Sequence, residues 1–225
     1  MNDNVDAEVL NLLARQGTRL LATRSTGYNH IDAAAAGRLG IDVVRVTDYS
    51  PHSVAEFAVG LQLAVNRKIA RASVRTRDGN VDLDGLMGFD LHGKLHCPLN
   101  EDTHHIVDAA SLARAKRGSI LVNTSRGGLV DTEAAMGALK TGQPGGLAID
   151  VYEQEASLFF QDLSSSIITD DVIQRLVSFP NVIVTGHQAF FTGEAVGQIM
   201  QTTLESISAP ERGEALTNRI PASET

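Results

Sequence analysis

The chain has 225 residues, of which 43% are hydrophobic and 20% are charged, and its formal net charge is −8. This size and balance suit one large or two modest globular domains, and the acidic charge without a Lys/Arg cluster argues against a nucleic acid or an anionic membrane surface as partner. The single cysteine excludes an internal disulfide, residues 1–10 lack the apolar core of a signal peptide, and no apolar run approaches the ~18 residues of a membrane span. We therefore expect a cytoplasmic protein.

Short apolar runs alternate with segments of helical periodicity along the chain. Strands are predicted at residues 20–22 and 42–46 around a helix at 30–39, followed by a long helix at 53–68 with a basic, polar continuation to residue 77. Residues 78–91 carry three glycines and no clear period, and they are predicted to be a linker. Further strands are expected at 95–99, 119–123, 146–152 and 181–185, and further helices at 108–116, 132–140 and 194–208. This alternation predicts an α/β protein with parallel sheets covered by helices.

Polar side chains follow the ends of four predicted strands. Arg126 follows ILVNTS, Asp150 and Glu155 follow GGLAI, His187 follows NVIVTG, and Tyr49 follows VVRVTD. Ligands of open parallel sheets bind at the carboxyl ends of the strands, so these residues are candidates for a site. An arginine suits a carboxylate, a histidine can exchange a proton near neutral pH, and an acid can orient that histidine. The set suits chemistry at a hydroxyl or carbonyl beside a carboxylate.

Each candidate also has a purely structural interpretation. Arg126 could belong to an ordinary ion pair, and His187 could be a satisfied core or surface histidine. Glu155 could be a solvated loop acid, Asp150 could cap a turn, and Tyr49 could be a packing aromatic. Strand-end position and spacing alone leave both interpretations open.

Longer strings favour the functional interpretation. The chain contains, in order, STGYNHID, YSPHSVAEFAVGLQLAVNRKI, LHCPLNEDTHHIV, GSILVNTSRGGLVDTEA, GGLAIDVYEQE and VTGHQAFFTGEA. From Val5 to about Ser208 it resembles the D-isomer-specific 2-hydroxyacid dehydrogenases, and most closely the bacterial D-lactate dehydrogenase branch. The resemblance implies an NAD-dependent oxidoreductase that reduces pyruvate to D-lactate. It also implies a flavodoxin-like substrate domain, residues 1–84 and 189–225, and a Rossmann NAD-binding domain, residues 85–188.

The same resemblance assigns roles to individual residues. Arg126 would bind the substrate carboxylate and polarise the carbonyl, His187 would give a proton to the keto oxygen, and Glu155 would keep His187 protonated. Gly186 replaces the proline that usually precedes this histidine, which predicts a looser loop. The substrate would be lined by Thr26, Gly27, Tyr49, Phe190 and Phe191, and the NAD by Cys97, Pro98, Thr124, Ser125 and Asp150. No metal is expected.

One part of the family pattern is missing. A dinucleotide is held by a G-x-G-x-x-G turn between a strand and a helix, and the sequence contains no such turn. In the family a glycine-turn unit follows FDLHGK, but here LHGK runs directly into LHCPLN. The gap amounts to two βαβ steps, roughly 60 residues at about 30 per unit. The strand and helix that open the family before VDAEVL are also not matched. We therefore expect an incomplete Rossmann domain that has lost its first mononucleotide half, a sheet edge without its partner, and impaired NAD binding.

Three hypotheses for the function follow from this combination of matching site residues and a missing glycine turn. The chain is an impaired dehydrogenase, or a noncatalytic module that binds 2-oxo acids or another partner, or an incomplete gene product without independent activity. A homodimer formed through the long helix after YSP is also expected from the resemblance. The sequence leaves open which 2-hydroxy acid is preferred and whether the truncation is natural.

Overall fold

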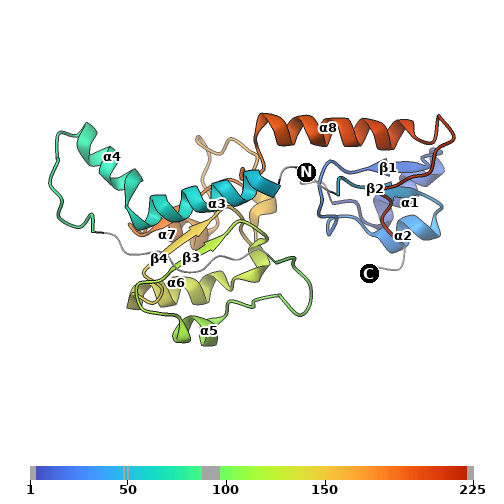
Figure 1. Ribbon diagram of the computed structural model, residues 1–225. Helices are drawn as coiled ribbons and strands as arrows, with labels where there is room; N and C mark the ends of the chain where they lie inside the picture. The colour runs from blue at the N-terminus through green and yellow to red at the C-terminus, as the bar shows by residue number, and fades with distance from the viewer. Residues whose placement is uncertain (1–3, 48, 50, 88–96, 222–225) are drawn as a thin grey trace. The chain divides into compact units, whose positions relative to one another are not determined.

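The computed structural model describes residues 4–47, 49, 51–87 and 97–221 (Figure 1). The chain forms two compact units, the first made of residues 1–51 and 190–225 and the second of residues 52–189. These boundaries differ from the expected domain limits, because residues 52–84 belong to the second unit. A compact unit need not coincide with a functional domain, so the assignment of the substrate and NAD-binding domains stays a prediction.

The first unit is built around a small parallel sheet. Strands β1 (Leu20–Ala22) and β2 (Asp42–Val44) pair in parallel register, Leu20 with Asp42 and Ala22 with Val44. The helices are α1 (Ala7–Arg15), α2 (Ala33–Arg38) and α8 (Gly193–Ser208). Asp6 and Asp32 cap α1 and α2 through backbone N–H groups in their first turns. The core of this unit contains Leu10, Ile31, Ala36, Val43 and Ile220.

The second unit is a three-layer sandwich. Its strands β3 (Ile120–Asn123), β4 (Gly146–Ile149) and β5 (Val182–Val184) form a parallel sheet in the order β3-β4-β5. The helices are α3 (Pro51–Asn66), α4 (Ile69–Arg77), α5 (Ala109–Arg114), α6 (Thr132–Thr141) and α7 (Asp171–Val177), with 3₁₀ turns η1 (Gly127–Leu129) and η2 (Glu155–Ser157).

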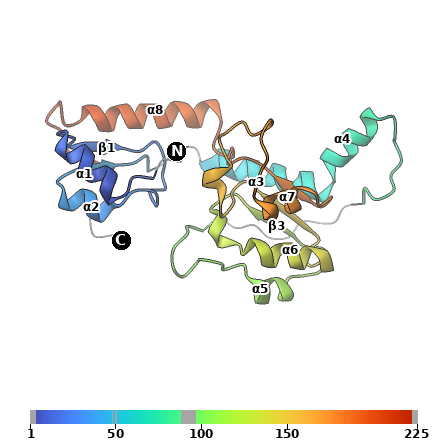
Figure 2. The ribbon, with the colours of Figure 1, turned by 180° about the vertical axis from the view of Figure 1, so that it is seen from behind.

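Successive side chains of a strand point to opposite faces of the sheet, and this alternation decides which helix covers which face. Ile120, Val122 and Ala148 pack against the α3 residues Ala58, Leu61 and Val65. Leu147 and Ile149 point the opposite way and pack with side chains of α6 and α7. Both ribbon views show α3 on one side of the sheet and α6 on the other (Figure 2). Because the three strands are parallel, their carboxyl ends meet at one edge of the sheet.

The structure confirms the α/β fold class and changes several element limits. The long predicted helix begins at Pro51 and ends at Asn66, and Lys68, with a φ of 50°, separates it from α4. Helices α1 and α7 were not predicted. Of the expected strand at 95–99, only residues 97–99 are described, and they are not a strand. Pro98 has no N–H to donate to a strand partner, and the carbonyl of Cys97 already accepts a hydrogen bond from Ser125 Oγ at 2.5 Å.

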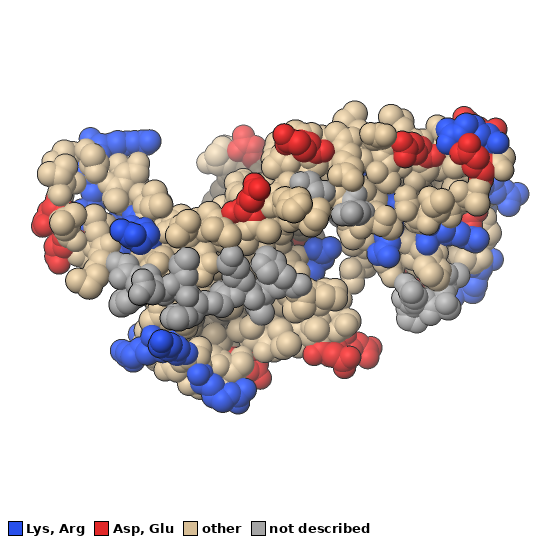
Figure 3. All heavy atoms as spheres, viewed as in Figure 1, with Lys and Arg blue, Asp and Glu red and all other residues tan. Residues whose placement is uncertain are grey.

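The face of the molecule drawn in Figure 3 carries charges of both signs. On the face shown in Figure 3, the Lys and Arg side chains of the described residues form several small groups interspersed with acidic ones. That face offers no continuous basic surface for a phosphate backbone. Among the helices that the structure describes, none combines the length and the apolar character needed to cross a membrane.

Candidate functional site

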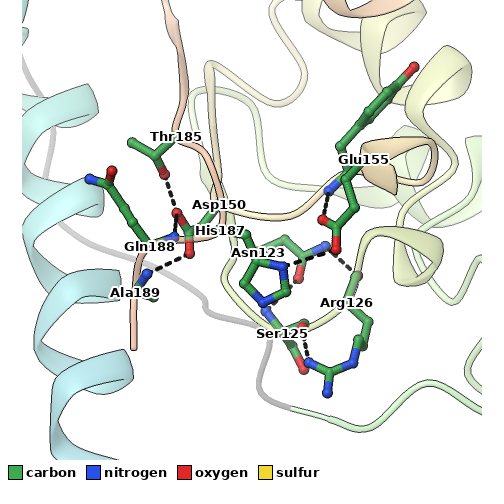
Figure 4. Close-up of polar contacts among 10 residues, drawn as sticks. Asn123, Ser125, Arg126, Asp150, Glu155, Thr185, His187, Gln188 and Ala189 are labelled. Atoms are coloured by element: carbon green, nitrogen blue, oxygen red, sulfur yellow. Dashed lines mark hydrogen bonds and ion pairs between the residues drawn. The ribbon is translucent and has the colours of Figure 1, made fainter. Parts of the chain in front are cut away.

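The loops that leave β3, β4 and β5 bring four of the sequence candidates to one edge of the second unit. Arg126 lies three residues beyond the end of β3, Asp150 and Glu155 follow β4, and His187 follows β5 (Figure 4). Parallel strands place all their carboxyl ends at the same edge, which is why residues so far apart in the sequence come together here.

His187 and Glu155 form a hydrogen-bonded pair. The distance from His187 Nδ1 to Glu155 Oε1 is 2.9 Å, and each side chain is about one-quarter exposed, at 25% and 26%. The second carboxylate oxygen of Glu155 accepts the backbone N–H of Tyr152 at 2.9 Å. The carboxylate is thus oriented from its own loop, and its hydrogen bond fixes the orientation of the imidazole.

Asp150 fixes the backbone of the His187 loop. It is fully buried, and its two carboxylate oxygens accept the N–H groups of Gln188 at 3.0 Å and Ala189 at 2.8 Å. Thr185 donates its hydroxyl to the same carboxylate, and the N–H of His187 donates to the carbonyl of Asp150 at 2.8 Å. Asp150 therefore anchors this loop on both sides of the histidine, and the loosening expected from Gly186 stays a prediction.

Arg126 lies on a loop that is braced by the strand before it. Asn123 donates from Nδ2 to the carbonyl of Arg126 at 2.8 Å and accepts the N–H of Ser125 at 3.1 Å. The guanidinium Nη1 donates to the carbonyl of Ser125 at 2.7 Å. Within the described ranges, no carboxylate forms an ion pair with Arg126. A half-buried guanidinium with this environment is suited to an anion supplied from outside.

Gly127 connects the arginine loop to the glutamate loop. A Cβ at this position would lie 2.1 Å from the carbonyl carbon of Tyr152 and 2.4 Å from the nitrogen of Glu153, so the two backbones touch directly. Only glycine allows such an approach. The positions of Arg126 and Glu155 are consequently coupled through backbone contact.

A second acid–histidine pair involves the same loop after β4. Glu153 Oε1 contacts His105 Nε2 at 2.6 Å, and its Oε2 accepts the N–H of Thr132, the first residue of α6, at 3.0 Å. Burial acts to raise the pKa of Glu153, but the hydrogen bonds from Thr132 and His105 outweigh it and hold the pKa below its usual value. Sequence reasoning missed this pair, although Glu153 lies in the DVYEQE string.

The five residues expected beside NAD differ in whether their polar groups already have hydrogen-bond partners. The hydroxyl of Thr124 is buried and has no hydrogen-bond partner among the described residues. Ser125 already donates to Cys97, Asp150 is occupied by its loop, and the carbonyl of Pro98 accepts Thr103 Oγ1 at 2.8 Å. Because an unpaired buried hydroxyl is costly, Thr124 fits a polar group such as the nicotinamide amide. The nicotinamide end of the cofactor is therefore compatible with the residues present.

The residues expected along the substrate lie in the first unit. Tyr49 and Phe190 make an edge-to-face contact with ring centroids 6.2 Å apart, and Phe190 and Phe191 make another at 6.0 Å. The carbonyl of Thr26 accepts Nη1 of Arg45 at 3.2 Å, and that of Gly27 accepts Ser25 Oγ at 2.7 Å. Across the part of the chain that the structure covers, no three His, Cys, Asp or Glu side chains are grouped as metal ligands.

Comparisons with known proteins identify the family. Residues 94–189 match the model of the D-isomer specific 2-hydroxyacid dehydrogenase, NAD binding domain. A 2-hydroxyacid dehydrogenase homolog of Schizosaccharomyces pombe is 43% identical, with 92% of this chain and 80% of the relative covered. The D-lactate dehydrogenase of Escherichia coli is 38% identical, with 98% of this chain and 84% of the relative covered. The solved pyruvate reductase of Chlamydomonas reinhardtii has a TM-score of 0.87 at 33% identity and covers 97% of this chain, which in turn covers 83% of it.

The alignment lengths also reveal an internal gap. The comparison with the Schizosaccharomyces pombe relative runs over 266 positions, but 92% of 225 residues is only about 207, so about 59 positions lie opposite no residue of this chain. This agrees with the roughly 60 residues of two βαβ steps. The chain belongs to the D-isomer-specific 2-hydroxyacid dehydrogenases, a family of NAD-dependent oxidoreductases, and is shorter than its relatives.

Proposed function

We propose that this chain binds a small 2-oxo acid and that its residues are those of a D-lactate dehydrogenase site for the reduction of pyruvate to D-lactate. The observation that carries the proposal is the His187–Glu155 pair, 2.9 Å apart, at the same sheet edge as an arginine without an ion-pair partner among the described residues. The proposal also draws on the relatives named as D-lactate dehydrogenases.

Each residue of the proposed site has one task. The guanidinium of Arg126 binds the carboxylate of the 2-oxo acid and withdraws electron density from the adjacent carbonyl. With Nδ1 directed at Glu155, the imidazole of His187 gives the proton on Nε2 to the carbonyl oxygen. NADH, when bound, supplies the hydride to the carbonyl carbon. His187 becomes neutral in this step and regains its proton from water, while the negative Glu155 favours that return.

The proposed cofactor contacts are unequal along the dinucleotide. Thr124, Ser125, Cys97, Pro98 and Asp150 would surround the nicotinamide, and the unpartnered hydroxyl of Thr124 supports that end of the site. The sequence lacks the glycine turn that binds a pyrophosphate with backbone N–H groups at a helix N-terminus. We therefore propose that NAD binding and turnover are strongly impaired in this chain.

A noncatalytic role is the second candidate. The same arginine could capture a 2-oxo acid without any hydride transfer, and the missing glycine turn beside a braced substrate loop favours this alternative. An incomplete gene product without independent activity is the remaining alternative. Calorimetry and turnover together distinguish the three.

Oxamate, a nonreacting analogue of pyruvate, provides the test. We expect calorimetric binding of oxamate to the folded protein, a loss of affinity of about 100-fold in Arg126→Gln, and no loss in Arg114→Gln, an exposed arginine of α5. Oxidation of NADH with pyruvate is expected to be far below that of ordinary dehydrogenases. Binding without any NADH oxidation supports the noncatalytic role, turnover at ordinary rates refutes the impairment, and a folded protein that ignores oxamate refutes both candidate functions.

We further propose a homodimer in the cytoplasm. Helix α3 carries two partly exposed apolar side chains on one face, Val59 at 37% and Leu63 at 39%, which a second subunit could cover. Cys97 is the single cysteine and is unpaired, as expected in a reducing compartment. Sedimentation of the wild type and of Leu63→Glu tests the dimer, which the charged variant should dissociate.

A further inference from the structure

The ring of Phe160 lies beside the imidazole of His187. Their centroids are 5.9 Å apart, and the ring planes are tilted by 39°. Phe160 lies in the loop after η2 and plays no part in the function proposed above. Both residues belong to the second unit, so their relative position follows from that unit alone.

Phe160 occupies this position at a cost to the fold. Its φ is 61°, in the left-handed region where a non-glycine residue costs about 1–3 kcal/mol. Its side chain is also 52% exposed, so it gains only part of the free energy that burial of a phenylalanine provides. A residue that served only stability would be poorly placed here.

The preceding residue explains how the loop is fixed. Phe159 is 9% exposed and belongs to the core cluster of Leu147 and Ile149, and its N–H donates to the carbonyl of Glu155 at 2.8 Å. With Phe159 held in the core, the left-handed backbone at the next position turns Phe160 out of the core and toward His187. The short segment 155–160 thus supplies two contacts to one imidazole.

The two contacts restrict different motions of the ring. The hydrogen bond to Glu155 sets the direction in which Nδ1 points, whereas a ring contact acts on the tilt of the imidazole plane. An aromatic ring against the imidazole face opposes a change in this tilt. We propose that Phe160 is a positioning residue for His187, which holds the imidazole at the angle needed to meet the substrate carbonyl. The inference rests on the proposed function of His187 as proton donor.

Variants at Phe160 separate positioning from stability. Phe160→Gly removes both the ring and the backbone strain, so we expect an unchanged or higher melting temperature together with a 3- to 10-fold weaker binding of oxamate. Phe160→Leu should weaken binding by a similar factor, and Phe160→Tyr, which keeps the ring, should bind within about twofold of the wild type. Lys68→Gly is the control, because Lys68 has a φ of 50° at the start of α4, outside the site, and relief of its strain should leave oxamate binding unchanged.

A second measurement works without any ligand. The ring current of Phe160 should shift the imidazole proton resonances of His187, so Phe160→Leu should move them and Phe160→Tyr should largely preserve them. Wild-type oxamate affinity in Phe160→Gly overturns the inference, and so do unchanged His187 resonances in Phe160→Leu. If the wild type binds no oxamate, the proposed function fails by itself and the resonances alone decide whether Phe160 orients the imidazole.

Discussion

Asp150 and Arg126 meet the cost of leaving water in opposite ways. Asp150 is fully buried, and its carboxylate accepts hydrogen bonds from Thr185, Gln188 and Ala189. Arg126 is half-buried, and its guanidinium donates to the neighbouring carbonyl of Ser125. A charge satisfied by the protein stabilises the fold, whereas a charge with unused donors is suited to a ligand. The two residues are therefore expected to affect different measurements.

Asp150→Asn should destabilise the protein. The amide keeps one oxygen, but its NH₂ group faces a backbone N–H that needs an acceptor, which leaves a buried donor unsatisfied. We expect a loss of about 2–4 kcal/mol in the free energy of unfolding, measured with urea. Asp162→Asn is the matched control, since Asp162 accepts from Ser164 on an exposed loop and should change stability by less than about 0.5 kcal/mol. Equal urea midpoints for the two variants would contradict the anchoring role.

Glu153→Gln should produce a pH-dependent loss of stability. The folded-state pKa of Glu153 lies below the ordinary value of 4.5, so its carboxylate stabilises the protein above that pH, and this contribution is lost as the pH falls through the folded pKa. We expect a deficit of about 1–2 kcal/mol at neutral pH that shrinks once the pH drops below 4.5. Urea unfolding at several pH values measures it. Glu101→Gln, at an exposed position, should leave stability unchanged, and a deficit for Glu153→Gln that is constant with pH would refute the explanation.

At the scale of elements, hydrophobic patterns were informative where an element is buried by many apolar side chains. Strand β4 is buried at every position and was predicted, whereas α7 has seven residues, follows a long loop and was missed. Helix α7 depends on specific contacts, since Asp170 caps it and accepts the hydroxyl of Tyr152 at 2.8 Å. Such short elements carry too few residues for a periodic signal.

The same distinction holds for the candidate site, where some residues were predicted from the sequence and others were not. Strand ends and family strings pointed to Arg126, Glu155 and His187, because parallel topology brings such positions together. Glu153 and His105 are 48 positions apart, and Phe160 reaches His187 through an unusual backbone conformation. No local pattern encodes these contacts, so they emerge only from the folded chain.

Two glycines offer a test of how closely the loops of the second unit approach each other. At Gly127 an added Cβ would meet the backbone of Tyr152 at 2.1 Å, whereas at Gly137, inside α6, it would meet nothing within 4 Å. Gly127→Ala should therefore lower the free energy of unfolding by about 2–4 kcal/mol, and Gly137→Ala should raise it by about 0.5–1 kcal/mol. Urea unfolding measures both. A Gly127→Ala protein as stable as the wild type would show that the arginine and glutamate loops are not in contact.

For the whole molecule, the decisive feature is a sequence that carries Arg126, Glu155 and His187 but lacks a glycine turn. In the described residues β3 pairs with β4 alone, which makes it an edge strand, whereas β4 is paired on both sides. The Schizosaccharomyces pombe relative carries about 59 aligned positions that this chain lacks. A glycine turn supplies backbone N–H groups and a helix N-terminus to a pyrophosphate, and the side chains proposed to contact the nicotinamide would not replace these contacts.

Inserting those residues should restore NADH binding and should change substrate binding much less. We expect a chimera with the corresponding ~60 residues of the Escherichia coli relative, inserted between Lys94 and Leu95, to bind NADH at least about 100-fold more tightly than the native chain, because the pyrophosphate regains its cradle. Oxamate affinity should change much less, since Arg126, Glu155 and His187 lie outside the inserted segment. Fluorescence titration with NADH and calorimetry with oxamate measure the two affinities, and Arg126→Gln in the chimera controls for substrate binding. Equal NADH affinity in the native chain and the chimera would mean that this protein holds the dinucleotide by contacts other than a glycine turn, and that the impairment proposed here is wrong.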